Sequence, residues 1–254
     1  MGHRQKSVRI LVALHKPYRM PEGEMYLPIQ VGKSLSKLDL RIQGDNSGEH
    51  ISEKNRNYCE LTALYWAWKN LDADYIGLAH YRRHFCLNRK KDKWSSVLDA
   101  SDVARVLKEA PVILPKKRNY LIETNESQYL HAHHREGWEA MYRIIASDYP
   151  ECLPALNRMR ESRKGHRFNM CIMRQDYFRA YCAWLFDILF KVEKSIDISG
   201  YSVSEARVFG YLGERMLDVW IDANQIPYRE AGVVFMEKQN WLKKGLNFLK
   251  RKFT

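Results

Sequence analysis

Short apolar runs separated by amphipathic segments constrain the fold of this chain more than any other feature of its sequence. Residues 8–14 and 74–79 are almost continuously apolar and end abruptly in polar residues, as strands buried on both faces of a sheet do. Further strands are predicted at 38–42, 111–115 and 166–173. Helices are predicted at 52–70, 101–109, 128–147, 177–192 and 202–223. This alternation predicts one α/β domain whose mostly parallel sheet is flanked by helices.

The composition excludes several classes of protein. Of the 254 residues, 45% are hydrophobic and 12% aromatic, which is too much apolar surface for a disordered chain. The sequence has no apolar run of about 18 residues that would span a bilayer, and it does not start like a signal peptide. Its five cysteines form no C-x-x-C pair, which argues against a disulfide framework or a zinc ribbon. We therefore expect a globular protein of the reducing cytoplasm.

The charge balance favours an anionic partner. The chain has 42 Lys and Arg and 30 Asp and Glu, a net charge of +12. Such a charge suits nucleic acid, an acidic membrane surface or a phosphorylated substrate. The cations are dispersed and no recognised nucleic-acid-binding motif occurs, so we expect no nucleic-acid partner. A basic nucleic-acid-binding protein is kept as an alternative function.

Polar segments follow three of the predicted strands. His15 and Lys16 follow the first, Gly44-Asp45-Asn46 follows the second, and His80-Tyr81-Arg82-Arg83 ends the third. Ligands of open α/β sheets bind at the carboxyl ends of the strands, where cations could hold a diphosphate. The same cations could instead only solvate the strand ends. Neither a Walker loop nor a GxGxxG fingerprint is present to decide between these readings.

Five further segments of the chain carry a family likeness: residues 51–70, 75–83, 168–173, 197–201 and 206–215. The most specific parts are ELTALYWAWKN at 60–70 and HYRR at 80–83. Over about residues 8–236 the chain resembles a bacterial family long catalogued only as a domain of unknown function. Its members occur among capsule, exopolysaccharide and O-antigen synthesis proteins. They are regarded as glycosyltransferases, and a galactofuranosyltransferase is among them.

The resemblance implies a GT-A-like, Rossmann-like domain over residues 1–236, followed by a basic tail over 237–254. It also implies a nucleotide-diphosphate sugar as donor, with a UDP-sugar favoured and UDP-galactofuranose one candidate. The implied acceptor is a lipid-linked saccharide of a surface polysaccharide. A catalytically inactive relative that only binds sugar nucleotides is a further alternative.

The metal site of the wider GT-A superfamily is missing from this sequence. That superfamily binds a divalent ion through Asp-x-Asp at the end of a strand, and His80 and Arg82 stand at those positions here. The literal Asp72-Ala73-Asp74 precedes the strand and is interpreted as part of a turn. We therefore expect no metal and no cofactor, because fixed cations can stabilise the leaving diphosphate instead.

The expected site residues fall into three groups. On the last predicted helix Arg207, Tyr211, Glu214 and Asp218 recur at steps of three and four, so they share one polar face. Glu214 and Arg207 are the expected catalytic residues, with Glu214 as general base and Glu60 or Asp45 as its competitors. The expected donor-binding residues are His15, Lys16, Asp45, Asn55, Glu60, His80, Tyr81, Arg82 and Arg83. The expected acceptor or sugar contacts are Asn169, His133 and His134.

The end of the chain predicts a membrane contact. Residues 239–254 include five Lys and Arg and no acidic residue. Drawn as a helix, this tail gathers Trp241, Leu246 and Phe253 on one side, the layout of a helix that lies on an anionic membrane. The alternatives are a solvated basic terminus and a helix packed on the domain. We expect a cytoplasmic protein that associates with the inner face of the cell membrane, with its oligomeric state left open.

Overall fold

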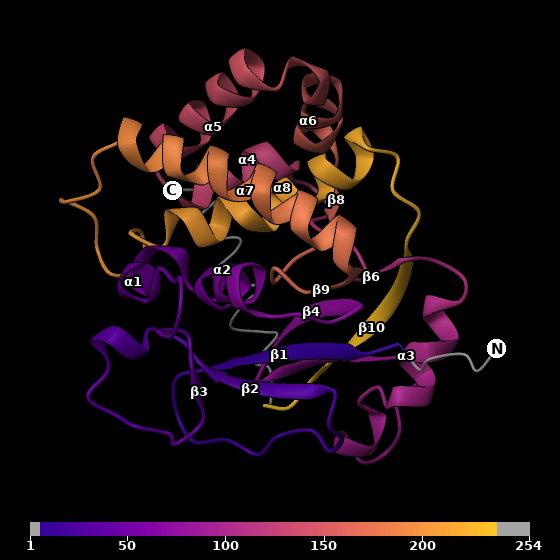
Figure 1. Cartoon of the computed structure of the whole chain (residues 1–254). Coiled ribbons are helices and arrows are strands. Elements are labelled where there is room, and N and C mark those ends of the chain that lie inside the picture. Colours follow the sequence, from indigo (N-terminus) through magenta and orange to yellow (C-terminus); the bar gives the residue numbers. More distant parts are fainter. Residues whose placement is uncertain (1–5, 238–254) are drawn as a thin grey trace.

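The apolar run at 8–14 forms strand β1 (Val8–Leu14) in the computed structural model, which describes residues 6–237 (Figure 1). Successive side chains of β1 point to opposite faces of the sheet. Leu11 and Ala13 join one core cluster, whereas Ile10, Val12 and Leu14 join the other. The strand is therefore buried on both faces, as the sequence predicts.

β1 belongs to an eight-stranded sheet with the order β3-β2-β1-β4-β5-β10-β6-β9, in which β9 also pairs with β4. The other strands are β2 (Tyr26–Gln30), β3 (Gln43–Gly44), β4 (Tyr75–His80), β5 (Arg83–Cys86), β6 (Val112–Pro115), β9 (Cys171–Arg174) and β10 (Arg229–Phe235). A separate two-stranded sheet pairs β7 (Arg118–Asn119) with β8 (Lys164–Gly165).

The sheet is mixed, not mostly parallel. β1 runs parallel to β2 and β4, β2 runs parallel to β3, and β6 runs parallel to β10. β9 is antiparallel to both β4 and β6, and β5 is antiparallel to β4 and β10. The carboxyl ends of β1, β4 and β6 therefore meet at one edge, and the chain enters β9 from that same edge.

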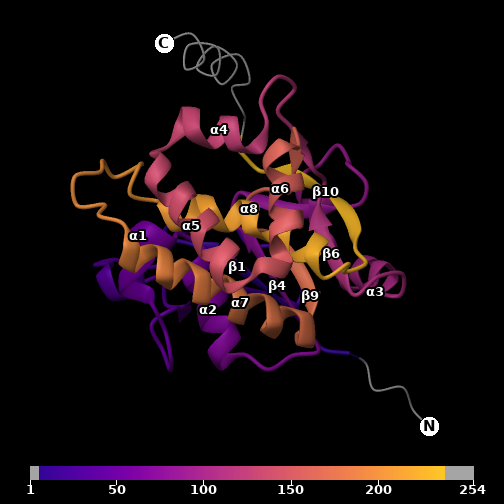
Figure 2. The same ribbon diagram turned by 90° about the horizontal axis from the view of Figure 1, so that it is seen from above.

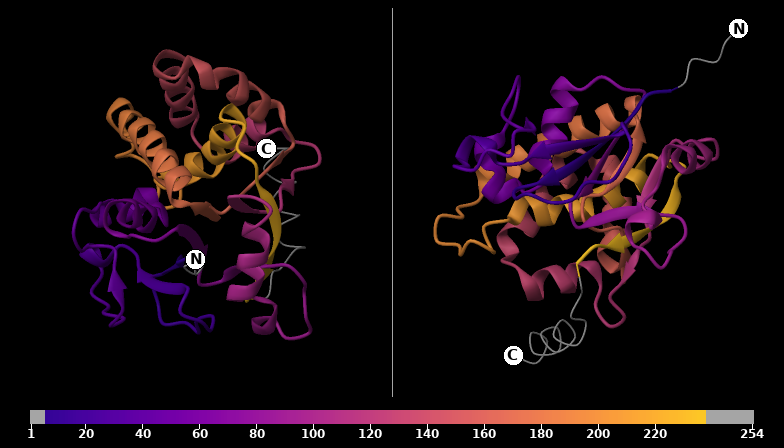
Figure 3. Two further views of the ribbon diagram at one scale, coloured as in Figure 1. Left: turned by 45° about the vertical axis from the view of Figure 1, so that its right-hand side comes forward. Right: turned by 90° about the horizontal axis from the view of Figure 1, so that it is seen from below.

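Helices cover the two faces of the sheet unequally (Figures 1 and 3). The larger core cluster packs under all the helices except α3, which lies over the smaller cluster. The helices are α1 (Asn55–Tyr58), α2 (Leu61–Asn70), α3 (Ala100–Leu107), α4 (Asn125–Ala132), α5 (Arg135–Asp148), α6 (Leu153–Glu161), α7 (Gln175–Ser195) and α8 (Val208–Ala223). α8 packs against α1, α5, α6 and α7.

One predicted strand is wrong and several strands were not predicted. Residues 38–42 form no strand, and the second strand is β2, at 26–30. Pro28 lies inside β2 and pairs in register with Val12 of β1. Proline lacks the backbone N–H that an interior strand donates, so the sequence gives little sign of this strand. The strand predicted at 166–173 begins only at Cys171, as β9, and β3, β5, β7, β8 and β10 were not predicted.

Three predicted helices differ from the observed ones, either because the helix is interrupted or because it begins later. The helix predicted over 52–70 breaks at Cys59, which has a φ of 55°. The one predicted over 128–147 splits at His133 and His134 into α4 and α5. Ser202 and Glu205 exchange the backbone-to-side-chain bonds of a capping box, but α8 begins only at Val208.

Two expectations concern membranes. Within residues 6–237, no helix combines the length and the apolar character needed to cross a bilayer. The predicted amphipathic tail at 239–254 lies outside the described residues, as does all but the first residue of the segment 237–254.

Candidate active site at the carboxyl edge of the sheet

The residues after β1 and β4 lie together, as the strand-end rule predicts. Lys16 Nζ lies 5.4 Å from the centre of the buried Tyr81 ring, and the Arg82 guanidinium lies 5.1 Å from it. The His15 ring meets the same tyrosine edge-on at 5.4 Å. Burial, and then the charges of Arg82 and Lys16, lower the pKa of His15. The carboxyl ends of β1 and β4 thus form one electropositive surface.

A carboxylate beyond the last strand faces this surface. Glu237 accepts a hydrogen bond from Arg82 at 3.1 Å, and its other oxygen lies 3.7 Å from Lys16 Nζ. All three side chains are roughly half exposed, so solvent screens these ion pairs. Lys16 and Arg82 are consequently accessible to solvent, and an anion with more charge than one carboxylate can displace Glu237 from them.

Behind the cations, Glu60 is held in a buried polar cluster. Asn169 Nδ2 donates to Glu60 Oε1 at 2.7 Å, and His80 Nε2 lies 3.5 Å from the same oxygen. His80 Nε2 also bonds the carbonyl of Phe168 at 2.9 Å. Burial alone would raise the pKa of Glu60, but the charge of His80 and the bond from Asn169 outweigh it and lower this pKa to about 2. Glu60 is therefore a fixed negative charge that orients His80.

The turn into β9 is strained at two successive residues. Phe168 and Asn169 have φ values of 77° and 53°, and each such left-handed non-glycine residue costs about 1–3 kcal/mol. Asn169 Nδ2 also donates to the carbonyl of Gly210 at 3.1 Å, which ties the turn to α8. The Arg83 guanidinium stacks on the Phe168 ring at 4.5 Å. This turn therefore places Asn169 and Arg83 beside the β4 end.

The first turn of α8 closes the site on the other side. Arg207 Nε donates to Cys59 Sγ at 3.0 Å, and the Arg207 guanidinium lies 5.4 Å from the Tyr211 ring centre. Burial raises the pKa of Cys59 to about 12, so this sulfur is a protonated thiol. His133 stacks on Tyr211 with ring centres 4.0 Å apart. The break at Cys59 thus brings α1 to the start of α8, a contact that sequence spacing did not reveal.

Glu214 lies one turn beyond Tyr211 and remains partly exposed. One of its oxygens lies 3.9 Å from the guanidinium of Arg215. The charge of Glu214 acts on both Cys59 and Arg83, so the carboxylate lies within electrostatic reach of the cluster. Because no side chain or amide within residues 6–237 donates a short hydrogen bond to its oxygens, Glu214 can accept a proton from a ligand.

Asp45, one of the expected donor-binding residues, is used up by contacts within the fold. Asp45 is fully buried and accepts hydrogen bonds from the Gly32 and Lys33 amides and from the hydroxyls of Ser52 and Thr62. These bonds tie the end of β2 to the start of α2. Asp45 has no free oxygen for a ligand or for proton transfer.

Asn55 and His134 also make contacts within the fold rather than with the cations. Asn55 Nδ2 donates to the Cys59 carbonyl at 2.7 Å and supports the break between α1 and α2. His134 stacks on Tyr201 and pairs with Glu205 at 3.2 Å, at the outer rim beside the segment that leads to α8. Of the expected residues, these two and Asp45 stand outside the group that the fold brings together.

The Asp-x-Asp sequence lies at the opposite, amino end of β4. Asp74 accepts hydrogen bonds from the amide and hydroxyl of Ser7, and Asp72 accepts one from Gln175. Among the described residues, no group of three or more His, Cys, Asp or Glu side chains could hold a metal ion. The interpretation of residues 72–74 as part of a turn is consistent with these contacts.

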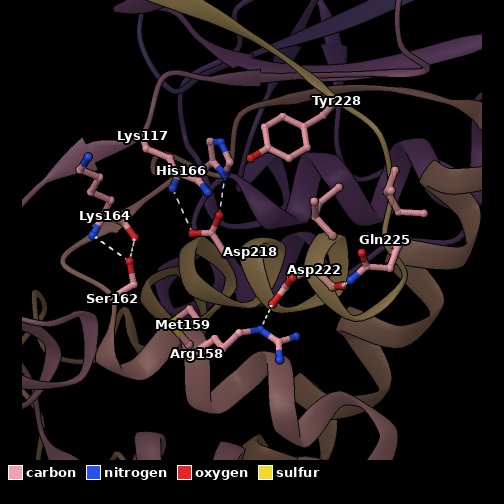
Figure 4. Close-up of a pocket in the computed structure, with 12 residues that line it drawn as sticks. Lys117, Arg158, Met159, Ser162, Lys164, His166, Asp218, Asp222, Gln225 and Tyr228 are labelled. Carbon is pink, nitrogen blue, oxygen red and sulfur yellow. Dashed lines mark hydrogen bonds and ion pairs between the residues drawn. The ribbon is translucent and has the colours of Figure 1, made fainter.

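Farther along α8, a cavity of about 420 Å³ opens at Asp218 (Figure 4). The buried His166 bonds Asp218 through Nδ1 at 2.5 Å and Glu230 through Nε2 at 3.1 Å. The Tyr228 ring and the Gln225 amide line the same cavity. Asp218 was expected on the polar face of the last helix, but His166 is 52 residues from it and 64 residues from Glu230, so sequence spacing did not predict the group.

Comparisons with known proteins identify one family model and one similar solved structure. The family model described as "Domain of unknown function (DUF4422)" matches residues 9–225. Among solved structures, the chain is similar to the apo structure of WbbM, a bifunctional glycosyltransferase, with a TM-score of 0.83 and 32% sequence identity. The match covers 91% of this chain and 46% of that one, so this chain spans about half the length of the solved protein. Comparison with curated proteins gives no match.

Proposed function

This chain belongs to the DUF4422 family, and we propose that it is a glycosyltransferase that moves a sugar from a nucleotide-diphosphate donor to a saccharide acceptor. The observation that carries the proposal is the meeting of Lys16 and Arg82 on the Tyr81 ring at the carboxyl edge of the sheet, with Arg207 within electrostatic reach of the neighbouring His15. The similarity to WbbM supports the same reaction class.

The sheet supports a GT-A-like interpretation of the fold. Strands β3, β2, β1 and β4 are parallel, and β9 is antiparallel beside β4. His80 ends β4 and Arg82 lies in the turn after it, at the place where the wider superfamily carries its metal-binding carboxylates. We infer that Lys16 and Arg82 bind the diphosphate of a UDP-sugar directly and that transfer needs no divalent metal.

The proposed transfer uses one carboxylate and the surrounding cations. Glu214 removes the proton of the acceptor hydroxyl. As it does so, the hydroxyl oxygen forms a bond to the anomeric carbon of the donor sugar. The bond from that carbon to the diphosphate oxygen breaks, and the electron pair leaves with the nucleoside diphosphate. Arg207 and Arg82 stabilise the negative charge that develops there. Glu60 and the Phe168 carbonyl orient His80 at the same edge.

The acceptor is proposed to lie along α8. Asn169 and His133 flank the first turns of this helix, and the cavity at Asp218 follows one turn beyond Glu214. Its aromatic ring, amide and carboxylates match the chemistry that binds sugar rings and hydroxyls. A lipid-linked saccharide of a bacterial surface polysaccharide is the acceptor class that we propose.

The proposal is tested by donor binding. Calorimetric titration with UDP-sugars, in the presence and absence of EDTA, should show binding that Arg82→Ala weakens about 10- to 100-fold, because a charge-assisted hydrogen bond contributes about 1.5–3 kcal/mol. Arg105→Ala is the matched control, since Arg105 lies on α3 and pairs with Asp102. Unchanged affinity in Arg82→Ala would show that the donor site is elsewhere. Binding that EDTA abolishes and Mn²⁺ restores would overturn direct binding by the cations.

Transfer itself separates an enzyme from an inactive relative. Donor hydrolysis or transfer to a saccharide should accompany donor binding. If the protein binds UDP-sugars in a way that depends on Arg82, yet releases no UDP with any acceptor or with water, it is a binding protein and not an enzyme.

A further inference from the structure

Leu121 and Ile122 form an exposed apolar tip in the loop between β7 and α4. Leu121 is 70% exposed and Ile122 is 50% exposed. Figure 2 shows this loop projecting from the body of the domain beside α6. Two adjacent large apolar side chains in water are unfavourable, so their position calls for a reason other than folding.

The backbone of the tip is held in a strained shape. Leu121 has a φ of 60°, in the left-handed region that branched side chains avoid. Asn119 Oδ1 accepts the Leu121 N–H at 2.9 Å, and Arg163 donates to the Leu121 carbonyl at 3.2 Å. The Ile122 N–H donates to the carbonyl of Tyr120 at 2.7 Å. The loop is therefore built to present these side chains outward.

Tyr120 anchors the tip to the domain. Its hydroxyl accepts a hydrogen bond from Arg167 Nε at 2.8 Å. The Arg167 and Arg118 guanidinium groups lie 5.1 Å and 5.5 Å from the centre of its ring. Because Arg167 is buried, Tyr120 links the exposed tip to the interior.

Exposed cations surround the apolar pair. They are Lys116, Lys117, Arg118, Arg163 and Lys164. Residues 116–122 and 162–165 contain no acidic residue. Of the flanking carboxylates, Glu123 is buried against His131, and Glu161 is exposed at the end of α6. Glu161 is the one exposed carboxylate that adjoins these segments in the sequence, and in the fold Lys117 also faces Asp218 and Glu230, so the five cations still outnumber the nearby carboxylates.

We propose that this tip, residues 116–122 together with Arg163 and Lys164, docks on an anionic lipid surface. Leu121 and Ile122 enter the boundary between headgroups and acyl chains, while the cations bind lipid phosphates. Lys117 and Lys164 also line the cavity at Asp218, so docking brings that cavity to the membrane surface. The inference does not depend on sugar transfer, because it is measured with lipid alone. It is also separate from the predicted contact of the tail.

The test is co-sedimentation of the full chain with vesicles of phosphatidylcholine and phosphatidylglycerol in equal parts. Leu121→Gly should lower the partition coefficient about tenfold, because it removes one inserted apolar side chain. Glycine favours the φ of 60°, so the fold should be retained and the melting temperature should not fall. Val203→Gly is the matched control, since Val203 is 88% exposed in another loop, and it should bind vesicles like the wild type.

A second set of variants tests the role of the cations. Lys116→Gln with Arg118→Gln should weaken binding to the mixed vesicles, whereas Lys90→Gln with Lys91→Gln should do so much less. Equal vesicle binding by wild type and Leu121→Gly would overturn the proposal. So would a loss of affinity by the tip variants for single-stranded oligonucleotide with no loss for vesicles, which would assign the patch to nucleic acid.

Discussion

In the part of the chain that the structure describes, Lys16 and Arg82 form ion pairs with one carboxylate, that of Glu237. If these cations bind the donor diphosphate, Glu237 competes with it for the same two groups. The chain itself then sets part of the donor affinity, through a residue from beyond the last strand.

Glu237→Gln should therefore tighten donor binding by up to about fivefold, because a partly exposed ion pair contributes about 0.2–1 kcal/mol. Calorimetric titration with a UDP-sugar measures the change, and higher salt should reduce it. Glu22→Gln is the control, since Glu22 is almost fully exposed and its nearest cation is Arg19, at 4.0 Å. Weaker binding in Glu237→Gln would mean that this carboxylate assists the donor rather than competing with it.

At Glu214 the expected effect is on turnover. Glu214→Gln keeps the size of the side chain and removes the proton acceptor, so turnover should fall about 10²- to 10⁴-fold with little change in donor affinity. Steady-state rates and donor titration on the same preparation check both parts. Glu139→Gln, on the exposed face of α5, should leave both unchanged. Near-normal turnover would show that Glu214 is not the general base.

At the scale of elements, α8 determines how closely the parts of the site meet. Gly213 on α8 lies so near the site that an added Cβ would stand 2.8 Å from Leu61 Cδ1 and 3.0 Å from Asn169 Oδ1. A larger residue would push α8 away from α2 and from the strained turn before β9. The position of Glu214, the next residue, depends on this contact.

Gly213→Ala should destabilise the fold by about 1–3 kcal/mol through overpacking and should also lower turnover. Gly200→Ala is the matched control, because its Cβ would meet nothing within 4 Å. Denaturant unfolding and activity are the two measurements. A neutral Gly213→Ala would show that α8 moves at no cost and does not fix the site.

The elements that could be predicted are those with a local signal. β1 and β4 have continuous apolar runs and were found, and the meeting of their polar ends followed from the rule for open sheets. The break at Cys59 and the turn at Phe168 have no such signal. Both depend on contacts with α8, more than 40 residues away in sequence, which stabilise backbone shapes that these residues disfavour alone.

At the scale of the whole molecule, the buried Glu60 links stability to acidity. Its pKa in the folded protein is about 2, below the ordinary value of 4.5. The unfolded chain therefore binds a proton on this residue at higher pH than the folded chain does. The contribution of Glu60 to stability is fully present above about pH 4.5 and is lost as the pH falls toward 2.

The free energy of unfolding should thus fall steeply between about pH 4.5 and 2, and Glu60→Gln should make this part of the curve flatter. Urea unfolding at a series of pH values measures both slopes. Glu53→Gln serves as control, because Glu53 is exposed and should leave the acid slope as it is. Identical slopes in wild type and Glu60→Gln would show that Glu60 is not ionised in the folded state.

The place of β10 in the sheet has a consequence for how the chain is made. β10, at 229–235, inserts between β5 and β6, strands that the ribosome has completed more than 100 residues earlier. Until that segment emerges, the nascent chain holds two unpaired strand edges beside a half-formed core, a state prone to aggregation. Synthesis that pauses before residue 229 should leave a chain that depends on chaperones, whereas release of β10 completes the pairing of those two strands.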